Sequence, residues 1–124
     1  MVIHAYIGVS DLIGDTDIIV LPEKIFNINL DIPWEHIYAS TAKELSSHGY
    51  DVMISSNPSV IGRAAAMVNE PSLIVLPANK LKEQWVEMLK KKRDETGKYH
   101  DKLNYVRVYR LWEDDISKAL ETAH

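Results

Sequence analysis

Two strand-to-helix junctions in the second half of the chain constrain its fold most. Residues 51–68 read DVMISSNPSVIGRAAAMV, and residues 72–93 read SLIVLPANKLKEQWVEMLKKKR. Each begins with a short apolar run rich in β-branched residues, is interrupted by proline and asparagine, and continues with apolar residues at helical spacing. Strands that alternate with helices in this way form parallel sheets, so the two junctions predict consecutive βα units.

Further apolar runs extend the alternation along the chain. We expect strands at residues 2–9, 17–21, 50–55, 73–76 and 103–109, and helices at residues 31–48, 57–68, 79–96 and from 113 onward. Gly49 and Gly97 end two of these helices. Residues 23–30 fit neither period, and residues 98–102 favour a mobile loop. The prediction is an α/β fold with a single domain over residues 1–124, a three-layer sandwich around a mostly parallel sheet of about five strands.

The apolar positions of the predicted helices indicate which side of each helix is buried. The expected inner residues are Trp34, Ile37, Tyr38, Thr41 and Leu45; Val60, Ile61, Ala64, Ala65 and Val68; Leu81, Trp85, Met88 and Leu89; and Ile116, Ala119 and Leu120. The three tryptophans fall in or near these patterns, which favours a role in the core or at an interface.

Composition excludes several classes of protein. The chain has no cysteine, which excludes disulfides and thiolate metal sites and indicates a reducing, cytoplasmic location. No apolar run approaches the length of a membrane span, so we expect no membrane association. The net charge is -4, and the only basic region is residues 79–102, with eight Lys or Arg against five Asp or Glu. A mildly acidic protein with one basic helix disfavours DNA or RNA as a partner.

A glycine-bearing turn, residues 8–17, follows the first predicted strand, where a phosphate-binding loop would lie. It has no lysine followed by serine or threonine, and it carries the carboxylates of Asp11, Asp15 and Asp17, which repel phosphate. The pattern is typical of an ordinary connection. Asp15 and Asp17 are candidate Mg²⁺ ligands, because hard cations prefer carboxylate oxygens, although two acids also suit a solvated turn.

Polar side chains follow the later strands. Ser55 and Ser56 precede Asn57 at one strand end, and Asn79 follows the other. Helix N-termini expose N–H donors, so a small anion could bind there, or both asparagines could simply cap their helices. The five histidines have no metal-binding spacing, and no serine lies in a nucleophile elbow.

The stretches GYDVMISSNPSVIGRAA and LIVLPANKLKEQWVEMLKKKR resemble the second half of small phage-encoded P-loop nucleotide-kinase-like proteins. The resemblance covers roughly residues 31–111 and implies a nucleotide-binding scaffold, with Lys82, Lys90 and Arg93 corresponding to cations of the lid helix. The chain departs from that family near residues 8–17, where the phosphate loop has no counterpart. The resemblance therefore implies a degenerate member that kept the scaffold and lost phosphoryl transfer.

Three functions follow as expectations. The first is a non-catalytic binding protein without a cofactor, of phage origin by the resemblance, that docks on a host or defence protein. Its expected contact residues are Asp11, Asp15, Asp17, residues 90–93 and, if their side chains are exposed, Tyr99 and Trp112. The second is a small kinase-like enzyme that binds a nucleotide with Mg²⁺, or another phosphorylated small molecule, through Ser10, Ser55, Ser56, Asn79, Lys90 and Arg93. The third is an assembly protein that forms a homodimer.

Overall fold

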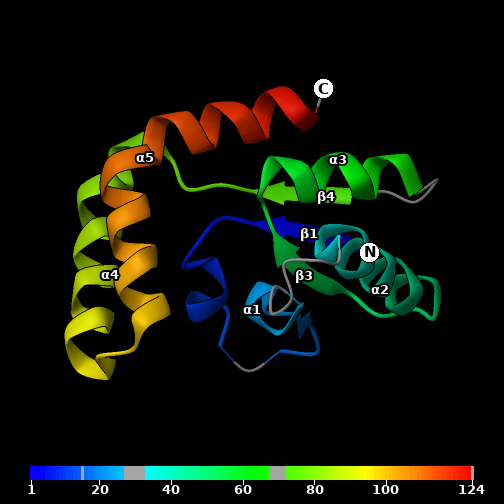
Figure 1. The fold of residues 1–124 in the computed structure, drawn as a ribbon, viewed down its shortest axis with the longest axis horizontal. Helices are drawn as coiled ribbons and strands as arrows, with labels where there is room; N and C mark the ends of the chain where they lie inside the picture. The colour runs from blue at the N-terminus through cyan, green and yellow to red at the C-terminus, as the bar shows by residue number, and fades with distance from the viewer. Residues whose placement is uncertain (15, 27–32, 68–71, 124) are drawn as a thin grey trace.

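The computed structural model describes residues 1–14, 16–26, 33–67 and 72–123, which form a mixed α/β fold with an all-parallel, four-stranded sheet (Figure 1). The strands are β1 (Val2–Ala5), β2 (Ile19–Val20), β3 (Val52–Ser55) and β4 (Ser72–Val75), in the order β2-β3-β1-β4. The helices are η1 (Val9–Leu12), α1 (Glu23–Phe26), α2 (Trp34–Ser47), α3 (Pro58–Met67), η2 (Asn79–Leu81), α4 (Lys82–Thr96) and α5 (Tyr99–Ala123). The predicted α/β class with a parallel sheet is confirmed.

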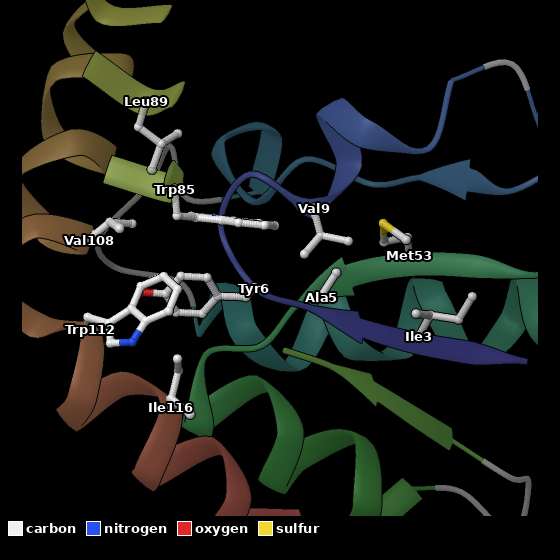
Figure 2. Packing of buried hydrophobic residues seen from close by; sticks show 10 residues of the cluster. All are labelled: Ile3, Ala5, Tyr6, Val9, Met53, Trp85, Leu89, Val108, Trp112 and Ile116. Carbon is white, nitrogen blue, oxygen red and sulfur yellow. The ribbon is translucent and has the colours of Figure 1, made fainter. Parts of the chain in front are cut away.

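The two faces of the sheet are buried by different kinds of segment. On one face α2 and α3 pack over the sheet in a cluster formed by Val2, Tyr38, Ala42, Val52, Ile54 and Val60. The alternate residues Ile3, Ala5 and Met53 belong to a second cluster, which includes Val9 of η1 and extends to Trp85 and Trp112 beyond the strand ends (Figure 2). Because α2 and α3 share one face, the expected three-layer arrangement is not confirmed.

Helix α5 replaces two predicted segments. The predicted strand at residues 103–109 is wrong, since it lies within this helix, and so do residues 99–102 of the predicted loop at 98–102; only Lys98 precedes the helix. Its buried residues Val108, Trp112, Ile116 and Ala119 recur at helical spacing, so the period of 3.6 holds over a longer window than the short alternation around Arg107. Without this strand, the sheet in the described residues has four strands.

Helix α5 bends at Leu111, where the backbone leaves helical geometry (φ -117°, ψ 15°). The part before the bend runs beside α4, and the two form a helical pair beyond the carboxyl ends of the strands (Figure 1). The part after the bend turns back along α3, where Thr122 lies next to Gly62. The bend therefore lets one helix contact both α4 and α3.

Local signals at helix ends had mixed outcomes. Gly97 ends α4 as predicted, in the left-handed conformation (φ 63°) with its N–H donating to Arg93 O at 2.9 Å. The predicted inner faces of α2 and α5 are wrong at Ile37 and Leu120, which are 44% and 49% exposed. Near Ile37 the small Ala39 is buried instead, because a small side chain allows closer packing, whereas Ala119 beside Leu120 is buried as predicted.

Candidate functional site

The candidate site lies where the strand order reverses. The chain leaves β1 toward β2 on one side of the sheet, and it leaves β3 to cross past β1 to β4 on the other side. Open parallel sheets bind ligands at such switch points, outside the carboxyl ends of the strands. Here a cleft of about 460 Å³ opens at the ends of β1, β2 and β3, and residues of α1, α4 and α5 complete its walls.

The end of β3 forms one wall and is held by a chain of hydrogen bonds. Tyr38 accepts a bond from Ser55 N–H at 3.0 Å and donates its hydroxyl to Leu21 O at 2.5 Å. Burial raises the pKa of Tyr38 well above its ordinary value, so the hydroxyl keeps its proton. Asn57 caps α3 as predicted, since its Oδ1 accepts a bond from Ser59 N–H at 3.1 Å.

The end of β1 forms the next wall and is fastened to α4. Trp85 Nε1 donates to Ile7 O at 2.7 Å. Gly8 has φ 94°, and a Cβ added there would lie 2.9 Å from Met88 Cε and 3.0 Å from Trp85 Nε1. Only glycine fits this conformation and this close approach, so Gly8 sets the path of the chain along the cleft.

Ion pairs line the helical wall. Lys92 bonds both carboxylate oxygens of Asp11, at 3.0 and 2.9 Å, and both partners are 40% exposed. Arg107 makes a bidentate pair with Asp115, at 3.0 and 3.1 Å. His100 lies 3.3 Å from buried Asp101. Exposed pairs contribute little to stability, so Lys92 can also contact an anion in the cleft at small cost while it stays beside Asp11.

The structure brings together some of the predicted anion-binding residues and not others. Ser10, Ser55 and Ser56 line the cleft. Asn79, Lys90 and Arg93 do not line it.

Arg93 pairs with Asp94 at 2.9 Å and stacks over the ring of Tyr105, 4.5 Å from its centroid. Lys90 is exposed on α4. The prediction that Asn79 caps a helix is wrong, because α4 has no side-chain cap and Asn79 Oδ1 accepts a bond from Trp112 Nε1 at 3.2 Å.

The predicted magnesium ligands are not brought into a cluster that the structure describes. Asp15 lies outside the described residues, and Asp17 is exposed. Among residues 1–14, 16–26, 33–67 and 72–123, no three His, Asp or Glu side chains are placed to hold a metal ion. A bound Mg²⁺ therefore stays a prediction.

Several residues of the site were not among the predicted ones. Lys92 was predicted only as part of residues 90–93, a docking element, and Arg107 only as part of a strand at residues 103–109, so neither was expected to face the strand tips. The row of buried residues along α5 could have placed Arg107 on a helix, because its spacing predicts one continuous helix and not a strand. Trp112 was a predicted docking residue, but it is 1% exposed and unavailable to a partner, whereas Tyr99 is 75% exposed.

Because His4 is buried in β1, we expect it to make the free energy of unfolding depend on pH. It is 1% exposed, and its Nδ1–H donates to Ser55 O at 3.0 Å. Burial lowers the pKa of His4 below its ordinary value of 6.5, so the unfolded chain binds more protons than the folded one just below that pH. We expect the free energy of unfolding, measured in urea, to fall as the pH decreases through about 6.5, and to recover at higher pH.

The control for this prediction is His4→Asn, which keeps a donor near the Nδ1 position and cannot be protonated. We expect the variant to lose part of the decrease between about pH 7 and pH 5. Identical pH profiles for the two proteins would show that His4 does not cause the decrease.

The turn after β1 does not have the composition of a phosphate-binding loop. After β1 the chain enters η1, whose residues Val9–Leu12 include Asp11 and no lysine, unlike a phosphate loop. Within the described helices, no stretch has both the length and the apolar character needed to cross a membrane. Comparison of the chain with protein-family models, curated proteins and solved structures finds no match.

Proposed function

We propose that the protein binds a small phosphorylated molecule, such as a nucleotide, in the cleft at the carboxyl ends of β1 and β3. The observation that carries this proposal is the position of the cleft at the switch point of the sheet. A cleft in that position has strand ends and a helix N-terminus on one side, which are the elements that parallel sheets use to hold anions.

The chemistry of the walls supports an anionic ligand with an apolar part. Ser55 and Ser56 lie at the start of α3, a ten-residue helix whose dipole favours negative charge there. Lys24, Lys92 and Arg107 add positive charge among the lining residues, which also include the carboxylates of Asp11, Glu23, Asp101 and Asp115. Apolar cleft residues, among them Val20, Leu21, Met53 and Leu103, suit the organic part of a ligand.

We propose binding without phosphoryl transfer. A kinase needs a lysine and a backbone cradle beside the transferring phosphate, and η1 has Asp11 at this point. Asp11 would repel phosphate unless Lys92 stays beside it.

Calorimetric titration with ATP, ADP, AMP, pyrophosphate and adenosine, with and without Mg²⁺, tests the proposal. We expect affinity to rise with phosphate count and adenosine to bind least, because the proposed contacts of Lys92 and of the start of α3 are made to the phosphates. Lys92→Ala should weaken binding of ATP about tenfold, since it removes a charged donor and leaves Asp11 unpaired. Exposed Lys91 does not line the cleft, so Lys91→Ala is the matched control and should change affinity less than about twofold.

Amide chemical shifts recorded during the titration would locate the ligand. We expect changes at Gly8, Ser55 and Ser56. Absence of binding across the panel, or shifts confined to residues outside the cleft, would contradict the proposal.

Docking on a protein partner is a second candidate, and one observation favours it. Tyr99, Leu103 and Val106 are 75%, 50% and 44% exposed at spacings of four and three on α5, so one side of this helix presents apolar side chains to solvent. A host or defence protein is the partner that the kinase-like resemblance implies, and a second copy of the chain would form a homodimer. Sedimentation at several concentrations distinguishes the homodimer, whose apparent mass rises with concentration.

A further inference from the structure

Tyr6, the residue after β1, has a buried hydroxyl without a partner. The residue is 3% exposed, and among the described residues its Oη is the buried side-chain polar atom that makes no hydrogen bond. Its ring packs edge-on against Trp112, with centroids 5.4 Å apart, and its oxygen points toward α5 (Figure 2). Burying a hydroxyl without a hydrogen bond is unfavourable, so this atom requires an explanation.

Tyr6 lines the cleft together with Asp115 and Arg107, and the charges of both act on the pKa of its hydroxyl. Asp115 and Arg107 lie on opposite sides of the bend at Leu111. Eight residues of a straight helix rise about 12 Å, so the bend is what allows the bidentate pair to form. Asp115 is 14% exposed and Arg107 is 45% exposed, which leaves the guanidinium the more accessible of the two.

The protonation states suit an exchange of partners. Burial, and then the Asp115 carboxylate, raise the pKa of Tyr6 well above its ordinary value, so its hydroxyl remains a donor. The hydrogen bonds with Asp115 raise the pKa of Arg107, which stays charged. Asp115 can therefore accept a hydrogen bond from either residue.

We propose that Arg107 binds the anionic group of the ligand, and that Tyr6 then donates its hydroxyl to Asp115 in place of Arg107. This inference rests on the proposed function and specifies which residues recognise the phosphate. Without ligand, Arg107 pairs with Asp115 and Tyr6 has no partner. With ligand, Arg107 pairs with the phosphate and Tyr6 donates to Asp115. The partly buried carboxylate of Asp115 therefore keeps a partner when Arg107 turns toward the phosphate.

The affinity of substituted proteins for ATP and pyrophosphate tests the role of Arg107. Arg107→Gln should weaken binding of both about 10- to 100-fold, because it removes charge-assisted hydrogen bonds. The matched control is Arg110→Gln, an exposed arginine of the same helix that does not line the cleft, which should change affinity less than about twofold. If circular dichroism shows that Arg107→Gln does not fold, Arg107→Lys replaces it, with an expected loss of about 3- to 10-fold because lysine lacks the bidentate fork.

The role of Tyr6 is tested by Tyr6→Phe, which removes only the hydroxyl. Affinity for ATP should fall about 3- to 10-fold, whereas the urea midpoint of the free protein should stay the same or rise, since an unpartnered polar atom is lost. In the Arg107→Gln background, Tyr6→Phe should cause no further loss of affinity, because the exchange no longer occurs. A purely structural role for Tyr6 would lower the urea midpoint instead.

The possible results separate the roles of Arg107 and Tyr6 from the proposed function itself. If wild-type protein binds ATP in the cleft and Arg107→Gln or its lysine substitute retains full affinity, the inference is overturned and the proposed function stands. If Tyr6→Phe binds as tightly as wild type, the exchange is overturned. If wild-type protein binds neither ATP nor pyrophosphate, both the inference and the proposed function are overturned.

Discussion

Trp112→Ala is expected to lower the free energy of unfolding by about 3–5 kcal/mol, which would be the largest effect of any substitution considered for this protein. Trp112 is 1% exposed and joins three segments of the fold. Its ring meets Tyr6 edge-on and lies 6.4 Å from the ring of Trp85, and its Nε1 donates to Asn79 Oδ1 at 3.2 Å. Alanine would leave a cavity between α5, α4 and the end of β1 and would also leave Asn79 without this donor.

Urea unfolding followed by circular dichroism measures this effect, with two comparison variants. Trp112→Phe keeps a ring and loses the donor, so it should cost about 1–3 kcal/mol. Tyr99→Ala removes an aromatic side chain that is 75% exposed on the same helix, and it should change stability by less than about 0.5 kcal/mol. Equal costs for Trp112→Ala and Tyr99→Ala would contradict the burial of Trp112 and would restore it as a docking residue.

Gly8→Ala is expected to cost about 2–4 kcal/mol, the second largest effect. Two separate terms contribute. The backbone at Gly8 has φ 94°, a conformation that side chains disfavour, and the new Cβ would lie 2.9 Å from Met88 Cε and 3.0 Å from Trp85 Nε1. The end of Met88 can move aside, but Trp85 is held by its hydrogen bond to Ile7 O.

Gly49 provides a control that separates the two terms. It has φ 95°, and a Cβ added there would meet no atom within 4 Å. Gly49→Ala should therefore show only the backbone term, about 1–2 kcal/mol in urea unfolding. The difference between the two variants measures the crowding at the cleft, and equal costs would show that α4 does not press on the end of β1.

Much of the fold was predictable because its signals are local. The start of α3 at Pro58 with Asn57 as its cap, the end of α4 at Gly97 and the four strands all depend on residues within one turn or one strand of each other. Ser10, Ser55 and Ser56 were predicted as site residues for the same reason, since parallel strands place their carboxyl ends along one edge.

Helix α5 was mispredicted because a short window supports two periods. Val106 and Val108 on either side of Arg107 alternate as a strand would, and they also fit a helix that buries Val108 and exposes Val106. The helical stripe becomes decisive only when Trp112 and Ile116 are included, which lie beyond the bend at Leu111. Packing of α5 against α4 favours the helix over the strand for these residues.

By itself, the sequence determined the class of fold, the strand-to-helix junctions and the capping of α3, because these depend on backbone preferences of neighbouring residues. Tertiary structure alone decided the chemistry of the cleft. Its contacts join residues far apart or across a bend: Lys92 meets Asp11 over 81 positions, and Arg107 meets Asp115 over eight. Such pairs form only after α4 and α5 dock on the strand ends, since the helix packing and the bend at Leu111 set the distances between these side chains.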